Sequence, residues 1–134
     1  MVKGGKTMRE IKFRAWDKKN KYMSGEKNWY FGIENDGSIE IYNCFSNKNP
    51  TKKENIIIMQ FTGLLDKNGK EIYEGDVIKH ADPEMEDDGG QVVWEDAIAG
   101  FTYGGECSSF PEKSWRYEVI GNIYSNPELI NTKS

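Results

Sequence analysis

The sequence predicts an all-β fold, either a small barrel or two small β subdomains built from consecutive hairpins, with one short C-terminal helical turn. Three observations favour this fold. Apolar residues recur at every second position in short segments, as they do in half-buried strands, and we count eight to ten such segments. Turn-forming Gly, Asn and Asp residues separate these segments at short intervals. No segment of ten residues or more has the 3.6-residue apolar spacing of an amphipathic helix.

The first hairpin is expected near the N-terminus. Its first strand starts at Arg9, and a polar turn at residues 17–20 leads to a short return strand at Tyr22-Met23. Strict alternation assigns its side chains to two faces. The inward face is expected to hold Ile11, Phe13 and Ala15, and the outward face Glu10, Lys12, Arg14 and Trp16.

A second hairpin is expected from two β-rich runs, residues 28–33 and 39–44, which flank Asp36-Gly37. This dipeptide accepts the positive φ angles of a type I′ turn. The polar stretch 47–55 that follows is the best candidate for a boundary between two lobes. The expected organisation is a disordered leader (1–7), an N-terminal hairpin subdomain (8–46), a linker (47–55), a barrel-like subdomain (56–130) and a tail (131–134).

The C-terminal part is expected to hold further short strands. The buried-looking strand 56–61 is broken by Thr62-Gly63, and Asn68-Gly69 is the strongest two-residue hairpin signal in the chain. We expect Gly75 to permit a tight bend and Asp76 to accept hydrogen bonds from exposed amides there. The remaining expected features are strands at 77–80, 91–94, 98–103 and 115–124, a bulge or bend at Gly121, and a helical turn at 125–130 capped by Asn126 with Pro127 in its first position.

Charge, cysteines and hydropathy limit the classes of function. Residues 1–60 hold 12 basic and 7 acidic residues, and residues 61–134 hold 6 and 15, so the two halves carry +5 and −9. The acidic half argues against nucleic-acid binding by the whole surface and favours contacts between basic and acidic parts of different copies. The two cysteines, Cys44 and Cys107, predict free thiols in a reducing cytoplasm, with a disulfide as the alternative. The longest apolar run, residues 56–59, is too short to span a membrane.

Motifs that would indicate catalysis or cofactor binding are scarce. The sole histidine, His80, precedes an acidic loop at 82–88, whose residues Asp82, Glu84, Glu86, Asp87 and Asp88 fit the calcium-loop spacing poorly. A solvated surface loop is therefore expected there, and divalent-ion binding is the alternative. The chain has no GxGxxG or GxxxxGK[ST] motif. We therefore assign no catalytic residue, metal ligand or cofactor.

A basic and aromatic stretch near the N-terminus is the most informative feature. Cationic side chains beside stacking rings are typical of single-strand binders, and Trp16 is expected to face outward for stacking. The alternative is a structural strand or an oligomer contact, with the charged residues in solvent. The candidate nucleic-acid or partner contacts are Arg9, Lys12, Arg14, Trp16, Lys18 and Lys19.

Three segments resemble a known family. Residues 8–17 (MREIKFRAWD) are similar to the opening of the YopX-like proteins of phages and prophages of Gram-positive bacteria. Residues 59–78 (MQFTGLLDKNGKEIYEGDVI) resemble the central signature of that family, and residues 117–129 (YEVIGNIYSNPEL) resemble its closing motif. The resemblance implies that Met8 is the natural start. It also implies a small cytoplasmic protein, encoded by a phage or prophage, that forms a homo-oligomer such as a trimer. It supplies no activity, so it assigns no catalytic residue.

Three hypotheses about function follow. The first is a non-enzymatic module that self-associates and binds a host or phage protein. The second is an accessory protein that binds single-stranded nucleic acid through residues 9–21. The third is a hydrolase that uses the carboxylates of the acidic loop and a divalent ion.

Overall fold

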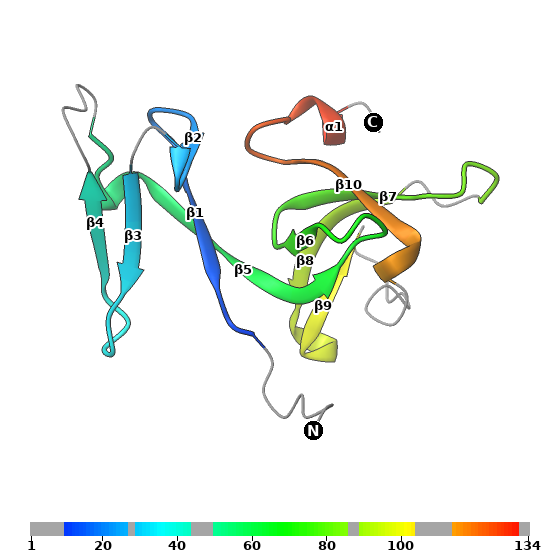
Figure 1. Ribbon diagram of the computed structural model, residues 1–134, viewed down its shortest axis with the longest axis horizontal. Helices are drawn as coiled ribbons and strands as arrows, with labels where there is room; N and C mark the ends of the chain where they lie inside the picture. Colours follow the sequence, from blue (N-terminus) through cyan, green and yellow to red (C-terminus); the bar gives the residue numbers. More distant parts are fainter. Residues whose placement is uncertain (1–9, 27–28, 44–49, 86–88, 104–113, 132–134) are drawn as a thin grey trace. The chain divides into compact units, whose positions relative to one another are not determined.

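The computed structural model describes residues 10–26, 29–43, 50–85, 89–103 and 114–131, and these form an all-β fold (Figure 1). Three sheets have the strand orders β2-β1-β5-β6, β10-β7-β8-β9 and β3-β4. Among the described residues, the helical structure is short: it includes the 3-10 turns η2 (Lys53–Asn55), η3 (Asp96–Ile98) and residues 114–116, and the one-turn helix α1 (Glu128–Asn131). The predicted fold class is confirmed.

The strands are short, as their sequence pattern predicts. They are β1 (Phe13–Asp17), β2 (Tyr22–Met23), β3 (Trp29–Ile33), β4 (Ile39–Asn43), β5 (Ile56–Leu65), β6 (Glu71–Tyr73), β7 (Asp76–His80), β8 (Gly90–Glu95), β9 (Gly100–Tyr103) and β10 (Tyr117–Asn122).

The chain forms two compact units. Unit 2 comprises Phe13–Met59, and unit 1 comprises the residues up to Lys12 together with those from Gln60 onward. Strand β5 runs through both units, with residues 56–59 in unit 2 and residues 60–65 in unit 1. The expected linker, 47–55, is described only from residue 50, where residues 50–55 belong to unit 2 and contain η2.

The core of unit 1 lies on the sheet β10-β7-β8-β9 and also includes Ile72 of β6. Tyr103 and Tyr117 share a hydrogen bond of 2.8 Å between their hydroxyl groups, so burial leaves neither hydroxyl without a partner. Burying each large apolar side chain contributes about 1.5–3 kcal/mol. The core residues are Ile72, Ile78, Val92, Phe101, Tyr103 and Tyr117.

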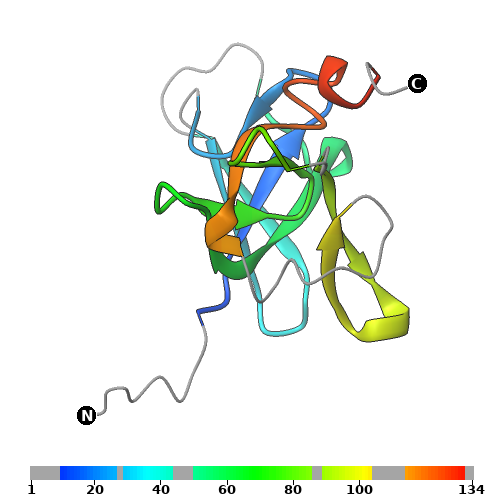
Figure 2. The same ribbon diagram turned by 90° about the vertical axis from the view of Figure 1, so that its right-hand side faces the viewer.

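The bend before β7 confirms the expectation for Gly75 and Asp76. Gly75 has a φ of +87°. The buried Asp76 accepts a hydrogen bond from the Tyr73 N–H, at 2.8 Å. From this bend the chain enters the four-stranded sheet, and Figure 2 shows the β8–β9 hairpin of that sheet with η3 at its turn.

The predicted assignment of side chains to the inward and outward faces of the first strand is wrong. Trp16 is only 5% exposed, whereas Phe13 is 37% exposed, and Ile11 lies before β1 and is exposed. Alternation assumes that one face of a strand meets solvent. Ala15, Trp16 and Asp17 are all buried, so both faces of the end of β1 are covered and Trp16 joins the core.

Both predicted hairpins at Asp-Gly and Asn-Gly form, but with a different turn. Gly37 donates its N–H to the Glu34 carbonyl (2.9 Å), and Gly69 donates its N–H to the Asp66 carbonyl (3.0 Å). Only the glycine of each pair has a positive φ, whereas a type I′ turn needs positive φ at two consecutive residues. Each loop is therefore a type I turn followed by a left-handed glycine.

Two glycines interrupt strands in different ways. Thr62-Gly63 does not end β5 as predicted; the strand continues to Leu65, with a register irregularity between Phe61 and Leu65. At Gly121 the predicted bulge is confirmed, since the pairing of β10 with β7 shifts between Val119 and Gly121. None of the described helices is long and apolar enough to cross a lipid bilayer.

Candidate binding surfaces

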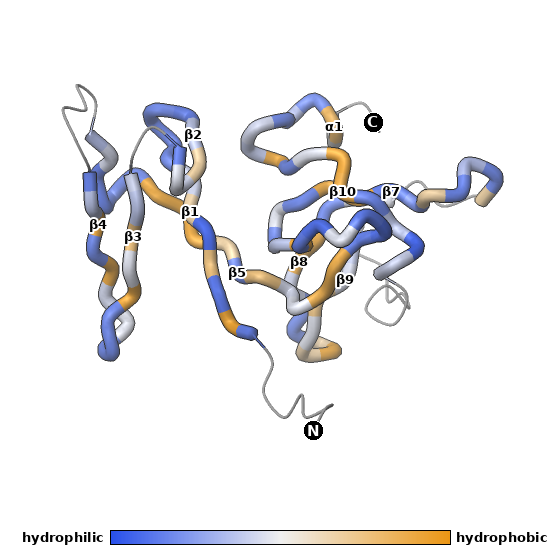
Figure 3. The backbone as a smooth tube through the Cα atoms, viewed as in Figure 1, coloured by the Kyte–Doolittle hydropathy of each residue, from blue (hydrophilic) through white to orange (hydrophobic). Residues whose placement is uncertain are grey.

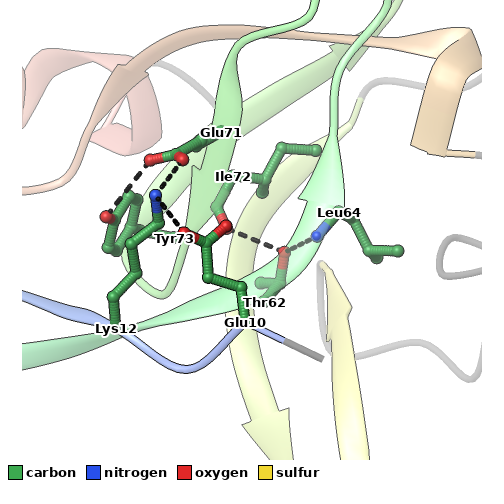
Figure 4. A network of polar contacts seen from close by, with 7 residues as sticks. All are labelled: Glu10, Lys12, Thr62, Leu64, Glu71, Ile72 and Tyr73. Atoms are coloured by element: carbon green, nitrogen blue, oxygen red, sulfur yellow. Dashed lines mark hydrogen bonds and ion pairs between the residues drawn. The ribbon is translucent and has the colours of Figure 1, made fainter. Parts of the chain in front are cut away.

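The predicted contact residue Lys12 belongs to an ion-pair network in unit 1 (Figure 4). Its ammonium group pairs with Glu71 and lies 3.3 Å from a carboxylate oxygen of Glu10. It also lies 5.1 Å from the centre of the Phe61 ring. The hydrogen bond to Glu71 is the main cause of the raised pKa of Lys12. The charge of Lys12 is therefore balanced by carboxylates of the same unit.

The same network binds two strands of unit 1 together. The Tyr73 hydroxyl donates to Glu71 (3.3 Å). The Thr62 hydroxyl donates to the Ile72 carbonyl (2.7 Å) and accepts from the Leu64 N–H (3.1 Å), beside the β5 irregularity (Figure 4). These contacts are structural.

The other predicted contacts do not form one face. Arg9 lies outside the described residues, Arg14 is half-buried and Trp16 is buried. Lys18 and Lys19 are exposed in the turn between β1 and β2. The predicted contact residues therefore lie in different places: Lys12 in the ion-pair network, Trp16 in the buried interior, and Lys18 and Lys19 in the β1–β2 turn.

The β1–β2 turn is organised around the buried carboxylate of Asp17. One carboxylate oxygen accepts the backbone N–H groups of Lys19 and Asn20, each at 2.9 Å. The other accepts the Asn20 side-chain amide (3.0 Å) and the Thr51 hydroxyl (2.6 Å). Burial by itself would raise the pKa of Asp17, but the hydrogen bonds from Asn20, Thr51 and Lys19 outweigh it and hold the pKa below its usual value.

This turn brings together two lysine groups that are distant in the sequence. The Lys18 N–H donates to the Asn55 carbonyl (2.8 Å), which places the turn beside η2. All five lysines of the two segments are exposed. We call them the lysine patch: Lys18, Lys19, Lys21, Lys52 and Lys53. Sequence spacing alone does not connect the last two with the first three, because the buried Asp17–Thr51 hydrogen bond and the Lys18–Asn55 backbone hydrogen bond bring the two segments together.

The β3–β4 hairpin has an apolar face. Phe31 pairs with Ile41, and Ile33 pairs with Ile39. Towards the base this face meets the core, where Trp29 is fully buried and packs on Tyr22 and Phe31 with ring centroids 6.4 Å apart. Towards the turn, Ile33 is 43% exposed, and Figure 3 shows the hydrophobic segments of both strands. We call Phe31, Ile33, Ile39 and Ile41 the ribbon face.

A shallow cavity of about 310 Å³ lies in unit 1, at the end of β7 and the start of β10. Met85 and the 59%-exposed Trp115 supply its apolar surface, and the Arg116 guanidinium stacks 4.8 Å from the centre of the Trp115 ring. Such a surface can accept an apolar side chain of a partner protein. Its lining residues are His80, Ala81, Asp82, Met85, Trp115 and Arg116.

The described part of the acidic loop and His80 have structural contacts. The His80 ring packs edge-on against Tyr117, and its Nδ1 accepts the Asp82 N–H (3.0 Å). Asp82 in turn accepts the Glu84 N–H (3.0 Å). Within the described residues, no three His, Cys, Asp or Glu side chains are grouped closely enough to hold a metal ion. Glu86, Asp87, Asp88, Cys44 and Cys107 lie outside the described residues.

Two solved structures are similar to this chain. The crystal structure of protein EF1440 from Enterococcus faecalis matches with a TM-score of 0.62 and 29% identity, covering 92% of this chain and 99% of that chain. The crystal structure of protein YopX from Bacillus subtilis matches with a TM-score of 0.53 and 22% identity, covering 91% and 96%.

No curated protein matches the chain. The family model described as YopX protein matches residues 12–131, which is most of the sequence, and this confirms the resemblance of the three motif segments. The chain belongs to the YopX protein family.

Proposed function

We propose that this protein is a non-enzymatic module that self-associates and acts by binding other proteins. The observation that carries the proposal is the ribbon face of β3–β4. A two-stranded hairpin is marginally stable alone, yet this one carries apolar side chains on one face and the exposed pair Tyr30–Tyr42 on the other. Contact of the ribbon face with another protein surface would bury its apolar side chains.

A second copy of the chain is the partner that the ribbon face fits best. The face has no charged side chain, so two identical faces related by a two-fold axis meet without repulsion. The acidic side chain of β4, Glu40, lies on the opposite face beside Tyr42. Apolar, self-complementary surfaces of this kind are typical of homodimer interfaces.

The buried polar groups support a structural role over a catalytic one. Asp17 and Asp76 use their carboxylates to bind backbone N–H groups of nearby turns. His80 uses one ring nitrogen in the same way and packs its ring on Tyr117. Side chains that make these contacts stabilise a rigid fold. The cavity beside Trp115 is a second surface that a protein partner could bind.

Sedimentation velocity across a wide range of protein concentration tests the self-association. We expect the native chain to form an oligomer and Ile33→Asn to weaken its association constant by about tenfold or more, since burial of one isoleucine is worth about 1.5–3 kcal/mol. Ile120→Asn is the matched control, because Ile120 is a strand residue of unit 1 with 42% exposure against 43% for Ile33.

The result has clear alternatives. A native chain that stays monomeric at every concentration contradicts the proposal. If Ile33→Asn and Ile120→Asn weaken self-association equally, the ribbon face is not the contact. If Trp115→Ala weakens self-association and Ile33→Asn does not, the contact lies at the cavity.

A further inference from the structure

We infer that the lysine patch of unit 2 binds the phosphate backbone of double-stranded nucleic acid, independently of sequence. This surface is distinct from the ribbon face, so the inference does not depend on the proposed self-association. It also differs from the predicted single-strand site at residues 9–21, because the structure pairs Lys12 with carboxylates, buries Trp16 and adds Lys52 and Lys53.

The local charge of the patch is positive. Residues 17–21 and 50–55 hold five lysines and two acidic residues, Asp17 and Glu54, which gives +3 in a chain of net charge −4. Asp17 is fully buried and its carboxylate is used by the turn, so Glu54 is the only exposed acidic side chain in these two segments. From outside them, the exposed carboxylate of Asp36 in the β3–β4 turn interacts with the charge of Lys53, and counting it leaves the patch at +2. None of the five ammonium groups forms an ion pair with a described carboxylate.

The backbone of the patch is fixed by hydrogen bonds. The four hydrogen bonds to Asp17 close the turn, and the Lys18–Asn55 bond holds it against η2. The positions of the lysine Cα atoms are therefore set before binding, and only the side chains must be ordered. Preorganisation of this kind lowers the entropic cost of binding.

The absence of an apolar anchor favours phosphate over an acidic protein as the ligand. Protein interfaces depend on buried aromatic or aliphatic anchors. Among the described residues, every exposed large hydrophobic side chain lies outside segments 17–21 and 50–55. Phosphate contacts need no apolar anchor, because release of counterions drives them.

The burial of the neighbouring ring favours a duplex over a single strand. Single-strand binders stack bases on exposed aromatic rings. The aromatic rings nearest in sequence are Trp16, which is only 5% exposed, and Tyr22, which is half-buried and packs on Trp29. The lysines themselves offer no stacking surface. Contacts to a duplex backbone need only cations, and they carry no sequence information.

Fluorescence anisotropy with a labelled duplex DNA of arbitrary sequence tests the inference. We expect a dissociation constant of roughly 10⁻⁵ M at low salt, with binding that weakens steeply between about 50 and 200 mM salt. The triple variant Lys18→Gln, Lys19→Gln, Lys52→Gln should bind at least tenfold more weakly, and its slope of log affinity against log salt should be smaller by up to about 2.7, at about 0.9 per lost contact.

A control variant with the same change in net charge is available in unit 1. Lys67, Lys70 and Lys79 are all exposed, and replacing them with Gln should leave both affinity and slope close to those of the native chain. Circular dichroism checks that both variants remain folded. Equal loss in the two variants would show that total charge and not the patch controls binding, and it would overturn the inference.

Two further measurements complete the test. Single-stranded DNA of equal phosphate number should bind no more tightly than the duplex; tighter binding contradicts the duplex assignment. If the patch variant binds DNA normally but loses self-association in sedimentation, the patch contacts the acidic surface of another copy and the inference fails.

Discussion

At the scale of single residues, two aspartates decide the geometry of their turns. Asp66 repeats in unit 1 what Asp17 does in unit 2. It accepts the N–H groups of Asn68 (2.8 Å) and Lys70 (2.9 Å) within its own turn and that of Val119 (2.9 Å) in β10. Each buried carboxylate thus holds a turn and also reaches a segment that is distant in the sequence. The lysine patch depends on this second contact, because Thr51 lies beside Lys52.

The Thr51–Asp17 hydrogen bond can be removed without a change in shape. We expect Thr51→Val to lower the free energy of unfolding by about 1–3 kcal/mol, because one oxygen of a buried carboxylate loses its hydroxyl donor. Urea denaturation measures this loss. Ser38→Ala is the control. The Ser38 hydroxyl also bonds a carboxylate, that of Asp36, but it does so in the exposed β3–β4 turn. Its loss should therefore change stability by less than about 0.5 kcal/mol. Equal effects would show that the Asp17–Thr51 contact adds nothing.

At the scale of elements, Gly89 sets how closely β7 and β8 approach. Gly89 has a φ of +74°, and a Cβ atom on it would lie 1.9 Å from the Ile78 carbonyl oxygen. Ile78 is part of the unit 1 core, and it pairs with Gly90. A side chain at position 89 would therefore force the backbone of the two strands apart.

A pair of glycine variants separates this clash from backbone strain. Gly69 has a similar φ of +81°, but a Cβ atom on it would meet nothing within 4 Å, so Gly69→Ala should cost only the left-handed conformation, about 1–2 kcal/mol. Gly89→Ala should cost clearly more, about 3 kcal/mol or above, because a steric clash in the sheet is added. Thermal and urea unfolding measure both. If the two variants lose the same free energy of unfolding, β7 and β8 accommodate the added methyl group at no extra cost.

The same elements show what the sequence can predict and where it fails. The positions of the hairpins follow from Asp36-Gly37 and Asn68-Gly69, whose glycines supply the positive φ that each loop needs. The burial of Trp16 does not follow from alternation, since a local pattern cannot tell whether a second layer covers the outer face. Nor can the lysine patch be predicted, because a contact across 34 residues, Asp17 to Thr51, brings its halves together.

At the scale of the whole molecule, the charge asymmetry follows the two units. Unit 2 has 8 basic and 6 acidic residues (+2), and unit 1 has 10 and 16 (−6), which together give the net charge of −4. Duplex binding by unit 2 therefore works against the negative charge of unit 1. This opposition should keep the affinity modest and make it strongly dependent on salt.

Acid should destabilise both units, because each contains an aspartate whose pKa is lowered. Burial would raise the pKa of Asp66, but the N–H groups of Val119, Lys70 and Asn68, and then the charge of Lys70, outweigh it. A carboxylate with a lowered pKa in the folded state contributes stability that is fully present above its unfolded pKa of about 3.9. That contribution is lost as the pH falls through the folded pKa.

Urea denaturation from neutral pH down to about pH 3 measures this loss, which should begin below about pH 5. Asp17→Asn and Asp66→Asn should each be less stable than the native chain at neutral pH, because an amide group cannot accept all the hydrogen bonds that the carboxylate accepts. Each should also show a smaller further loss in acid, since the titrating group is gone. A variant whose stability falls with pH as steeply as that of the native chain would show that its aspartate is not a source of the acid sensitivity. If the double variant keeps the full slope, carboxylates other than these two control the acid stability of the molecule.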